Sequence, residues 1–534
     1  MKPKILVSLT AVLALGSVVA LLFVSSQQIH AGTNNQPPPP PPPPVGTLGG
    51  PLAGLPSSVS QLFNAGYYEF NVKWDPIRGL GPVFTRATCF TCHGGGNNVI
   101  TQCMFNPQGV ACVDGGSSTI LGTRYGKWNP DGTFNYLDGS GTYPENEGGP
   151  TLHAQSVSQF GTLPYCSERT IAGAPTGATE SGTTVTITTT APHQFSAGQN
   201  AQVLSVPVSG YNGTFSILTV PTSTTFTYTA LQSGLVASGG GNASNMPQEV
   251  VPADATVVDG LRSTELYGLG LIDAIPESTI LQNSGVNKGM GITGVANMVP
   301  DQNGNIHAGR FGQKANIPNL LMFTAFAFNN ELGITNAYFP VQHLPSGQNY
   351  PSRCAPDTSN PEDVNGLDFL QDYQFNELLA PVAPGKSTSQ TLAGKAVFEN
   401  IGCNLCHIES MTTGPNIQLA TDLNGGLTEV VGPLSNVTAY LYSDLLLHEM
   451  GTGLTGGIPF QPEQLGQATL TRWRTAPLWG LSTRLALGLM HNNKATDLNT
   501  AILDHGGEAT QVVGLYQGLS PTDQANLFAF LSSL

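Results

Sequence analysis

The sequence Cys89-Phe90-Thr91-Cys92-His93 recurs, with the same spacing, as Cys403-Asn404-Leu405-Cys406-His407. Two thiols spaced in this way can each form a thioether bond with one of the two vinyl groups of a porphyrin. The histidine that follows then lies below the ring, where its imidazole can bind the iron. A zinc site or a redox C-x-x-C pair would not require the histidine at both copies. The motifs therefore predict two covalently bound c-type haems, with Cys89, Cys92, Cys403 and Cys406 as attachment points and His93 and His407 as proximal ligands.

The composition indicates an acidic, loop-rich protein. Of 534 residues only 10% are charged, the formal net charge is −15, and 64 residues are glycine and 40 are proline. A negative charge of this size argues against nucleic acid as a partner. It would suit a small basic redox protein, although solubility alone also explains it. The length predicts roughly three folded units.

The N-terminus indicates export. Lys2 and Lys4 precede an apolar run over residues 5–24, and a small residue, Ala31, offers a cleavage site. This pattern predicts a signal peptide over residues 1–31. The run is also long enough to cross a bilayer, so a retained membrane anchor is the alternative, and a membrane is expected as a partner only in that case. Both alternatives place the body outside the cytoplasm, periplasmic or secreted.

A proline-rich linker is predicted over residues 32–56. Its eight consecutive prolines, Pro37 to Pro44, favour a stiff polyproline II spacer. Beyond it, four cysteines lie outside the haem motifs, and an even number in an oxidising compartment favours disulfides. Cys103 with Cys112 is the most local pairing and would leave Cys166 with Cys354, but three connectivities stay open.

Residues 176–245 differ in pattern from the rest of the chain. Thr183 to Ala191 reads TTVTITTTA, and later β-branched runs alternate between turn signals such as Tyr211-Asn212-Gly213. This pattern predicts a small β-sandwich or barrel. It is expected to be inserted into an N-terminal haem domain that comprises residues 57–175 and 246–385.

The C-terminal haem domain is predicted over residues 386–534. A helix over residues 389–400 leads directly into Cys403, with Leu392, Ala396 and Val397 expected to face the core. A last helix is expected after Ser520, a favourable N-cap that precedes Pro521. Two such helices crossing over one haem would form a cytochrome c core. The predicted fold class is therefore mainly α, with two cytochrome c-like haem domains, long loops and the small all-β insert.

The sixth position on each iron decides between electron transfer and substrate chemistry. His505 is the best candidate for the second haem, because Asp497 caps a short helix that ends at His505. The helix dipole, which favours histidine at such a position, is the alternative explanation. His153 is a candidate distal ligand of the first haem. His448 is expected to bind a propionate or to pack in the second domain.

The stretch Met490-His491-Asn492-Asn493-Lys494, followed by Leu498-Asn499-Thr500-Ala501-Ile502, resembles the corresponding part of bacterial dihaem cytochrome c peroxidases. In that family a methionine fourteen residues after the first histidine of the stretch binds the electron-transfer haem. In this chain the same position is His505. The resemblance therefore implies a bis-histidine haem where the relatives use methionine.

Further motifs resemble the dihaem c-type oxidoreductases described as peroxidase-like or "thiol oxidoreductases", which are related to those peroxidases. The resemblance covers most of residues 60–170 and 246–534 and omits the β insert. That family usually has tryptophan at the position of Gln313, so coupling between the two haems is in doubt here. The motifs are Gly79-Leu80-Gly81-Pro82, Gly268 to Pro276, Gly309-Arg310-Phe311-Gly312, Tyr442 to His448, Arg474 to Gly480 and His505 to Ala509.

The resemblance implies a peroxidase-like oxidoreductase. Its C-terminal haem would accept electrons from a small redox protein, and its N-terminal haem would reduce peroxide or another small oxidant. Glu265, close to Arg262, is the candidate acid–base group, with a structural ion pair as the alternative. Peroxidase relatives also hold Ca²⁺ between the haem domains, but the acidic stretch Asp301 to Asn305 indicates only a turn. A non-enzymatic electron-transfer cytochrome and a dihaem oxygenase are the alternative functions.

Overall fold

The computed structural model of the chain describes most of the predicted haem domains and the β insert. The predicted signal peptide and residues 32–40 of the proline-rich linker lie outside the described residues. Among the residues described, no helix is both long and apolar enough to cross a bilayer. The described residues are 41–93, 103–104, 111–112, 121–128, 130, 134–135, 152–153, 155–160, 166, 168–245, 255–342, 362–363, 365–383, 385–423, 428–454 and 471–534.

The prediction of a mainly α protein is wrong. Of the described residues 30% are helical and 20% are in strands, which form many small antiparallel sheets. Frequent glycine and proline interrupt helices and leave chain that pairs in short ladders instead. The α-helices are α2 (Ser57–Asn71), α3 (Cys89–His93), α4 (Leu269–Asp273), α5 (Glu277–Leu281), α6 (Leu320–Leu332), α7 (Leu367–Leu378), α8 (Ser389–Asn400), α9 (Leu498–Leu503), α10 (Thr510–Gln517) and α11 (Pro521–Leu531).

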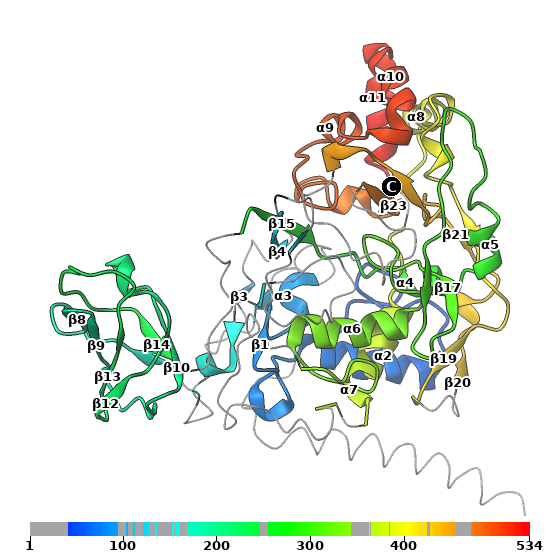
Figure 1. Cartoon of the computed structure of the whole chain (residues 1–534). Helices are drawn as coiled ribbons and strands as arrows, with labels where there is room; N and C mark the ends of the chain where they lie inside the picture. Colours follow the sequence, from blue (N-terminus) through cyan, green and yellow to red (C-terminus); the bar gives the residue numbers. More distant parts are fainter. Residues whose placement is uncertain are drawn as a thin grey trace, which may run out of the picture.

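Each haem motif lies beside a crossing of two helices, and the crossings are built alike. In the C-terminal part, a Cβ at Gly394 of α8 would overlap the carbonyl oxygen of Asn526 on α11. In the N-terminal part, a Cβ at Gly66 of α2 would overlap the carbonyl oxygen of Gln371 on α7. A glycine at each crossing therefore lets the two backbones touch. Figure 1 shows α2 with α7 in the lower part of the molecule and α8 with α11 at the top.

The same two crossings carry matching aromatic pairs. Phe398 lies four residues after the glycine of α8, and its ring centre is 5.3 Å from that of Phe530 on α11. Phe70 lies four residues after the glycine of α2, and its ring centre is 4.9 Å from that of Phe375 on α7. The four rings are buried. The chain therefore contains two similar helix crossings, one for each motif.

Both helices of the C-terminal crossing begin where the sequence predicts and α8 also ends there, but the predicted buried face of α8 is wrong. Thr388 caps α8 in a capping box, and Ser520 caps α11 by accepting from the Asp523 amide at 3.2 Å. Gly394 and Phe398 are the buried residues of α8, whereas Leu392 is 59% exposed. The close approach of α11 selects the glycine face of α8, because a face of larger side chains would hold the two backbones apart.

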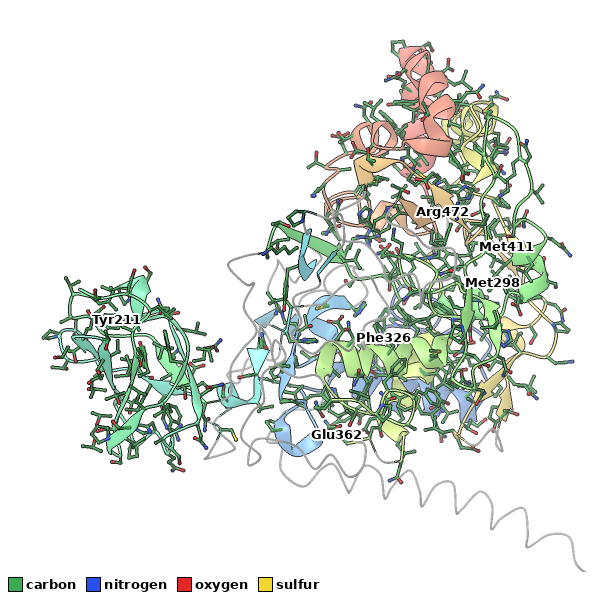
Figure 2. All side chains as sticks on the ribbon, in the orientation of Figure 1. Tyr211, Met298, Phe326, Glu362, Met411 and Arg472 are labelled. Carbon is green, nitrogen blue, oxygen red and sulfur yellow. The ribbon has the colours of Figure 1, made fainter. Side chains whose placement is uncertain are left out.

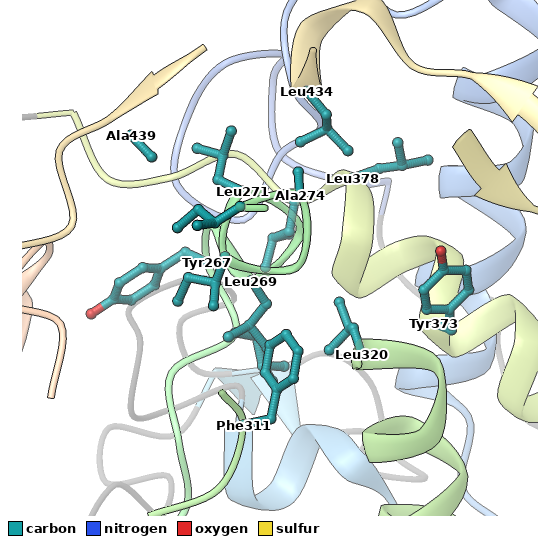
Figure 3. Packing of buried hydrophobic residues seen from close by; sticks show 14 of the residues in the cluster. Tyr267, Leu269, Leu271, Ala274, Phe311, Leu320, Tyr373, Leu378, Leu434 and Ala439 are labelled. Atoms are coloured by element: carbon teal, nitrogen blue, oxygen red, sulfur yellow. The ribbon is translucent and has the colours of Figure 1, made fainter. Parts of the chain in front are cut away.

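The two predicted haem domains share one large apolar core around α4. Leu269 and its neighbours on α4 pack against Leu434 and Ala439 on one side and against Leu320 and Phe311 on another (Figure 3). Helix α4, Phe311 and Leu320 precede the second motif in the chain, whereas Leu434 and Ala439 follow it. The segments before and after the second motif thus bury each other's apolar surface. The haem sites are held in a fixed relationship by this shared packing.

The β unit forms a separate lobe (Figure 1). Two four-stranded antiparallel sheets, in the orders β11-β10-β14-β7 and β12-β13-β9-β8, enclose one apolar core. Tyr211, labelled in Figure 2, is fully buried in this lobe. The first strand lies before the predicted boundary at residue 176. The strands are β7 (Arg169–Thr170), β8 (Ala178–Ser181), β9 (Thr184–Thr188), β10 (Asn200–Leu204), β11 (Gly213–Ser216), β12 (Thr219–Thr222), β13 (Thr225–Thr229) and β14 (Asn242–Ser244).

Short antiparallel ladders connect the helices elsewhere. The longest joins β4 to β15, whose last residue, Arg262, lies two residues before Thr264, the residue whose carbonyl contacts His93. The pairs are β1 (Val83–Phe84) with β6 (Gln155–Ser156), β2 (Cys103–Met104) with β3 (Ala111–Cys112), β4 (Leu121–Trp128) with β5 (Phe134–Asn135) and β15 (Val257–Arg262), β16 (Met298–Pro300) with β17 (Ile306–Ala308), β18 (Met411–Thr412) with β21 (Thr438–Ala439), β19 (Gln418–Ala420) with β20 (Thr428–Val430), and β22 (Leu447–Glu449) with β23 (Arg472–Arg474).

Candidate functional site: two haem motifs and a shared charged wall

The first motif forms the short helix α3, and a distant loop orients its histidine. His93 Nδ1 lies 3.1 Å from the carbonyl oxygen of Thr264. Because a carbonyl can only accept, Nδ1 carries the proton and Nε2 keeps its lone pair. Burial lowers the pKa of His93 to about 4, so the imidazole is neutral at pH 7. The Phe70 ring of α2 packs on it, with ring centres 6.1 Å apart. His93 can therefore offer Nε2 to a metal.

The second motif repeats this arrangement with different residues. His407 Nδ1 lies 2.9 Å from the carbonyl oxygen of Tyr442. Burial lowers the pKa of His407 to about 4. Phe398 of α8 packs on the imidazole, with ring centres 6.4 Å apart. A neutral histidine whose second nitrogen donates to a backbone carbonyl is the usual form of a metal-binding imidazole.

His505 lies at the end of α9, where the sequence places it. Asp497 caps this helix by accepting from the Thr500 amide at 2.8 Å. His505 Nδ1 lies 2.7 Å from the carbonyl oxygen of Ala501, which leaves Nε2 with a lone pair. Burial lowers the pKa of His505. The structure thus brings two neutral imidazoles, His407 and His505, to the wall of one cavity.

That cavity has a volume of about 230 Å³ and also exposes the thiols of Cys403 and Cys406. Burial raises the pKa of Cys403 to about 12, so its thiol is protonated at pH 7. The donor set, two thiols and two imidazole lone pairs within apolar walls, fits a covalently held, six-coordinate haem. The apolar walls are formed by Ile292, Phe398, Leu478, Leu498, Ile502 and Leu527.

Glu265, the candidate acid–base group, lines the same cavity. Its Oε1 atom accepts from Arg262 and pairs with Arg484. Arg262 also donates through Nε to the carbonyl of Met490 at 3.1 Å. The carboxylate of Glu265 therefore links β15 to the C-terminal part of the chain. This is the structural ion pair that the sequence analysis gave as the alternative to an acid–base role.

His448 is buried in a network of charges. Its Nε2 lies 2.9 Å from Asp444 and its Nδ1 lies 2.8 Å from Glu508. Lys288 binds the same Asp444 oxygen at 2.6 Å. Burial alone would lower the pKa of His448, but hydrogen bonds with Asp444, Cys406 and Glu508 raise it to about 11. At pH 7 this imidazole is doubly protonated and has no lone pair for a metal.

Aromatic side chains complete the cavity wall, and a lysine outside the lining contacts one of them. The Trp473 and His491 rings stack with centres 3.6 Å apart. Lys314 Nζ lies 3.4 Å from the centre of the Trp473 ring and donates to the carbonyl of Arg472 at 2.6 Å. Gln313, which stands where relatives usually have tryptophan, lines the cavity and donates to the Arg262 carbonyl at 3.2 Å. Trp473 was not expected from the sequence, since neither its stacking nor its cationic neighbour is local in the chain.

An acidic residue that the sequence did not indicate lies against the first motif. Asp372 Oδ2, on α7, is 3.6 Å from Cys89 Sγ. Burial, and next the neighbouring Glu69, raise the pKa of Asp372 well above its ordinary range. An acidic side chain whose pKa is raised thus lies beside a proposed attachment point for the first haem.

A model of the family described as "Di-haem oxidoreductase, putative peroxidase" matches residues 238–534, which is more than half of the chain. The chain belongs to this dihaem oxidoreductase family. The match includes the second motif, the charged cavity wall and His505, and it begins near the end of the β lobe. The first motif lies before the matched residues.

Other comparisons add little to the family assignment. No curated protein matches the chain. Among solved structures, hydrazine synthase of Kuenenia stuttgartiensis is similar at 16% sequence identity with a TM-score of 0.21. The alignment covers 36% of this chain and spans 58% of that one. A similarity of this extent carries no conclusion about fold or function.

The remaining predicted site residues of this dihaem oxidoreductase have other roles or stay open. His153 is buried, with Nε2 2.7 Å from the carbonyl of Asn330, so that contact occupies one of its ring nitrogens. Asp301 Oδ1 accepts from the amides of Asn303 and Asn305, each at 2.8 Å, and so closes the predicted turn. In the described part of the chain, no group of three or more His, Cys, Asp or Glu side chains could hold a metal ion.

Three of the four cysteines outside the haem motifs lie before the residues that the family model matches. Cys103 and Cys112 are opposite each other in the β2–β3 ladder. Cys166 is buried and disulfide-bonded. Cys354 lies outside the described residues. In the described part of the chain, the four cysteines of the two motifs form no disulfide.

Proposed function

We propose that this dihaem oxidoreductase is an extracytoplasmic c-type cytochrome with peroxidase-like activity, in which the C-terminal haem transfers electrons and the N-terminal haem meets the substrate. One observation carries the proposal. His407 and His505 present two neutral imidazoles to the cavity that also holds the thiols of Cys403 and Cys406. A site with both axial positions filled is suited to electron transfer and closed to substrate.

The chain's own residues would prepare each site. Haem, when bound, supplies the iron that exchanges electrons with donor and oxidant. The carbonyls of Thr264 and Tyr442 hold the protons of His93 and His407 on Nδ1, which directs Nε2 toward the metal position. Asp372, whose pKa is raised by burial, lies beside the first motif, where reduction of a peroxide bond would consume protons. Glu265 is better suited to joining the two halves of the molecule.

The proposed partners follow from charge and compartment. A small redox protein with a basic surface would be attracted to a chain of net charge −15. The oxidant would be peroxide or another small molecule. The proposed location is the periplasm or the exterior of the cell, with membrane attachment only if residues 1–31 are retained. Ca²⁺ between the haem domains is a further proposal from the resemblance alone.

The resting spectrum tests the proposal. Haem-stained denaturing gels should show two covalent haems in the wild type and one in either Cys89/Cys92 or Cys403/Cys406 double serine variants. One haem should be low-spin, and the other should be high-spin and react with hydrogen peroxide. Two low-spin haems inert to peroxide and carbon monoxide would instead indicate an electron carrier, and a stable dioxygen adduct would indicate an oxygenase.

A further inference from the structure

Three arginines and one carboxylate give the wall of the His407–His505 cavity an excess of positive charge. Arg262 and Arg484 both pair with Glu265. Arg474 lines the cavity as well. The remaining charged residues on the cavity wall, His448 and Glu508, pair with each other. The net charge of the cavity wall is therefore +2.

Arg474 is the residue whose charge is least compensated. Its Nε donates to the carbonyl of Gly312 at 2.8 Å, and a second nitrogen, Nη1, lies 3.5 Å from the carbonyl of Thr475. In the part of the chain that the structure describes, it has no carboxylate partner. Burial, and next the charge of Arg262, lower the pKa of Arg474 to about 10, so the guanidinium remains charged at pH 7. A half-buried cation of this kind, with no carboxylate partner among the described residues, is stabilised when an anion approaches it.

We propose that Arg474, supported by Arg262 and Arg484, is a carboxylate-binding site for the two propionate groups of the haem attached at Cys403 and Cys406. Guanidinium groups bind carboxylates in a planar, two-bond geometry. The two thioether bonds occupy the vinyl side of a porphyrin, which leaves the propionate side for the part of the cavity away from the cysteines. Two propionates carry the two negative charges that the cavity wall lacks.

The inference rests on the proposed haem at the second motif, and the experiment separates the two. The full-length holoprotein is used, and haem-stained gels first establish that Cys403 and Cys406 carry haem. If they do not, the proposed function fails. If they do, the midpoint potential of that haem is measured by spectroelectrochemistry in the wild type and in Arg474 variants.

Removal of a positive charge beside the propionates favours the ferric haem, because the ferric state carries one more positive charge. Arg474→Gln should therefore lower the midpoint potential of the C-terminal haem. Arg474→Lys keeps the positive charge, so its midpoint potential should stay close to that of the wild type. Arg472→Gln is the matched control, because Arg472 lies on the same strand, makes the same change in charge, pairs with Glu449 and is not among the residues that line the cavity. It should leave the potential unchanged.

A second variant keeps the test decisive if Arg474→Gln does not accumulate. Glu265→Gln removes the negative charge that Arg262 and Arg484 share, and it should shift the same potential upward. An unchanged potential in either Arg474→Gln or Glu265→Gln, with haem retained, would overturn the proposal.

A carboxylate from solution is the other possible source of the anion. Malonate is therefore added to each protein during the titration. With propionates in place, malonate should not change the potential of the wild type or of any variant. A malonate-dependent shift that occurs in the wild type and disappears in Arg474→Gln would show that the site binds a free carboxylate, and it would overturn the assignment to propionate.

Discussion

His505 and His407 lie on the wall of the same cavity, each with Nδ1 on a backbone carbonyl and Nε2 left for a metal. Nearly a hundred residues separate them in the sequence, and α8, α9 and α11 bring them together. The arrangement supports His505 as the sixth ligand of the second haem, where dihaem peroxidases use methionine.

Replacement of His505 tests this ligand directly. His505→Met should keep the second haem low-spin, raise its midpoint potential and introduce the weak red absorption of a thioether bound to ferric iron, because imidazole stabilises ferric iron more than a thioether does. His505→Ala should give a high-spin signal. His491→Gln is the control, since its ring stacks on Trp473 instead. A second haem that stays bis-histidine in both His505 variants would identify another residue as the ligand.

The charge network at His448 predicts a pH-dependent loss of stability. His448→Gln should lower the free energy of unfolding at pH 7 by about 2 kcal/mol, because two charge-assisted hydrogen bonds are lost and buried Asp444 keeps only Lys288 as its cationic partner. The folded pKa of His448, about 11, lies above the ordinary value of about 6.5. The stabilisation is thus complete below about pH 6.5 and is lost as the pH rises toward 11.

Urea unfolding followed at the haem absorbance, at pH 7 and at pH 10, measures this effect. The difference between the wild type and His448→Gln should be smaller at pH 10. His307→Gln is the control, because His307 is 41% exposed between Glu277 and Asp301 and should contribute little. A difference that grows with pH would contradict the assigned charge.

The glycines at the two helix crossings predict a loss of stability when alanine replaces either of them. Gly394→Ala should destabilise the C-terminal crossing by about 2 kcal/mol or more, because its Cβ would overlap the Asn526 carbonyl. Gly66→Ala should do the same at the N-terminal crossing. Gly514→Ala, on α10, is the control: nothing lies within 4 Å of its Cβ, and alanine should stabilise the helix slightly. Chemical unfolding measures all three, and equal stability of Gly394→Ala and the wild type would contradict this packing.

The β lobe should be dispensable for haem binding. Arg169 on β7 is paired with Ala243 on β14, so the chain enters and leaves the lobe on neighbouring strands. Residues 169–243 can therefore be removed and Glu168 joined to Ser244 through two glycines, since paired Cα atoms lie about 5 Å apart. Haem-stained gels and spectra of the purified product should show both haems.

A partial deletion provides the control for the β lobe. Removal of residues 213–229 takes out β11, β12 and β13 and exposes the rest of the shared core of the two sheets, including Val185, Ile187 and Val203. That variant should be insoluble, whereas the complete deletion should be soluble. Loss of both haems from the soluble, complete deletion would show that the lobe is required.

The sequence alone determined the features whose cause is local. Two thiols and a histidine at fixed spacing identify each proposed haem site, and Thr388, Asp497 and Ser520 mark helix starts because a capping side chain bonds to an amide within the first turn. Alternating β-branched residues likewise indicate the strands of the β lobe.

The tertiary structure decided what depends on residues far apart in the chain. Ladders of two or three residues carry no periodicity that a sequence can display, which is why the mainly α prediction failed. Contact between Gly394 and α11 decides which face of α8 is buried, and Leu392 lies on the exposed face. The protonation of His448 and the pairing of Glu265 with Arg484 likewise arise only when folding removes water and brings distant charges together.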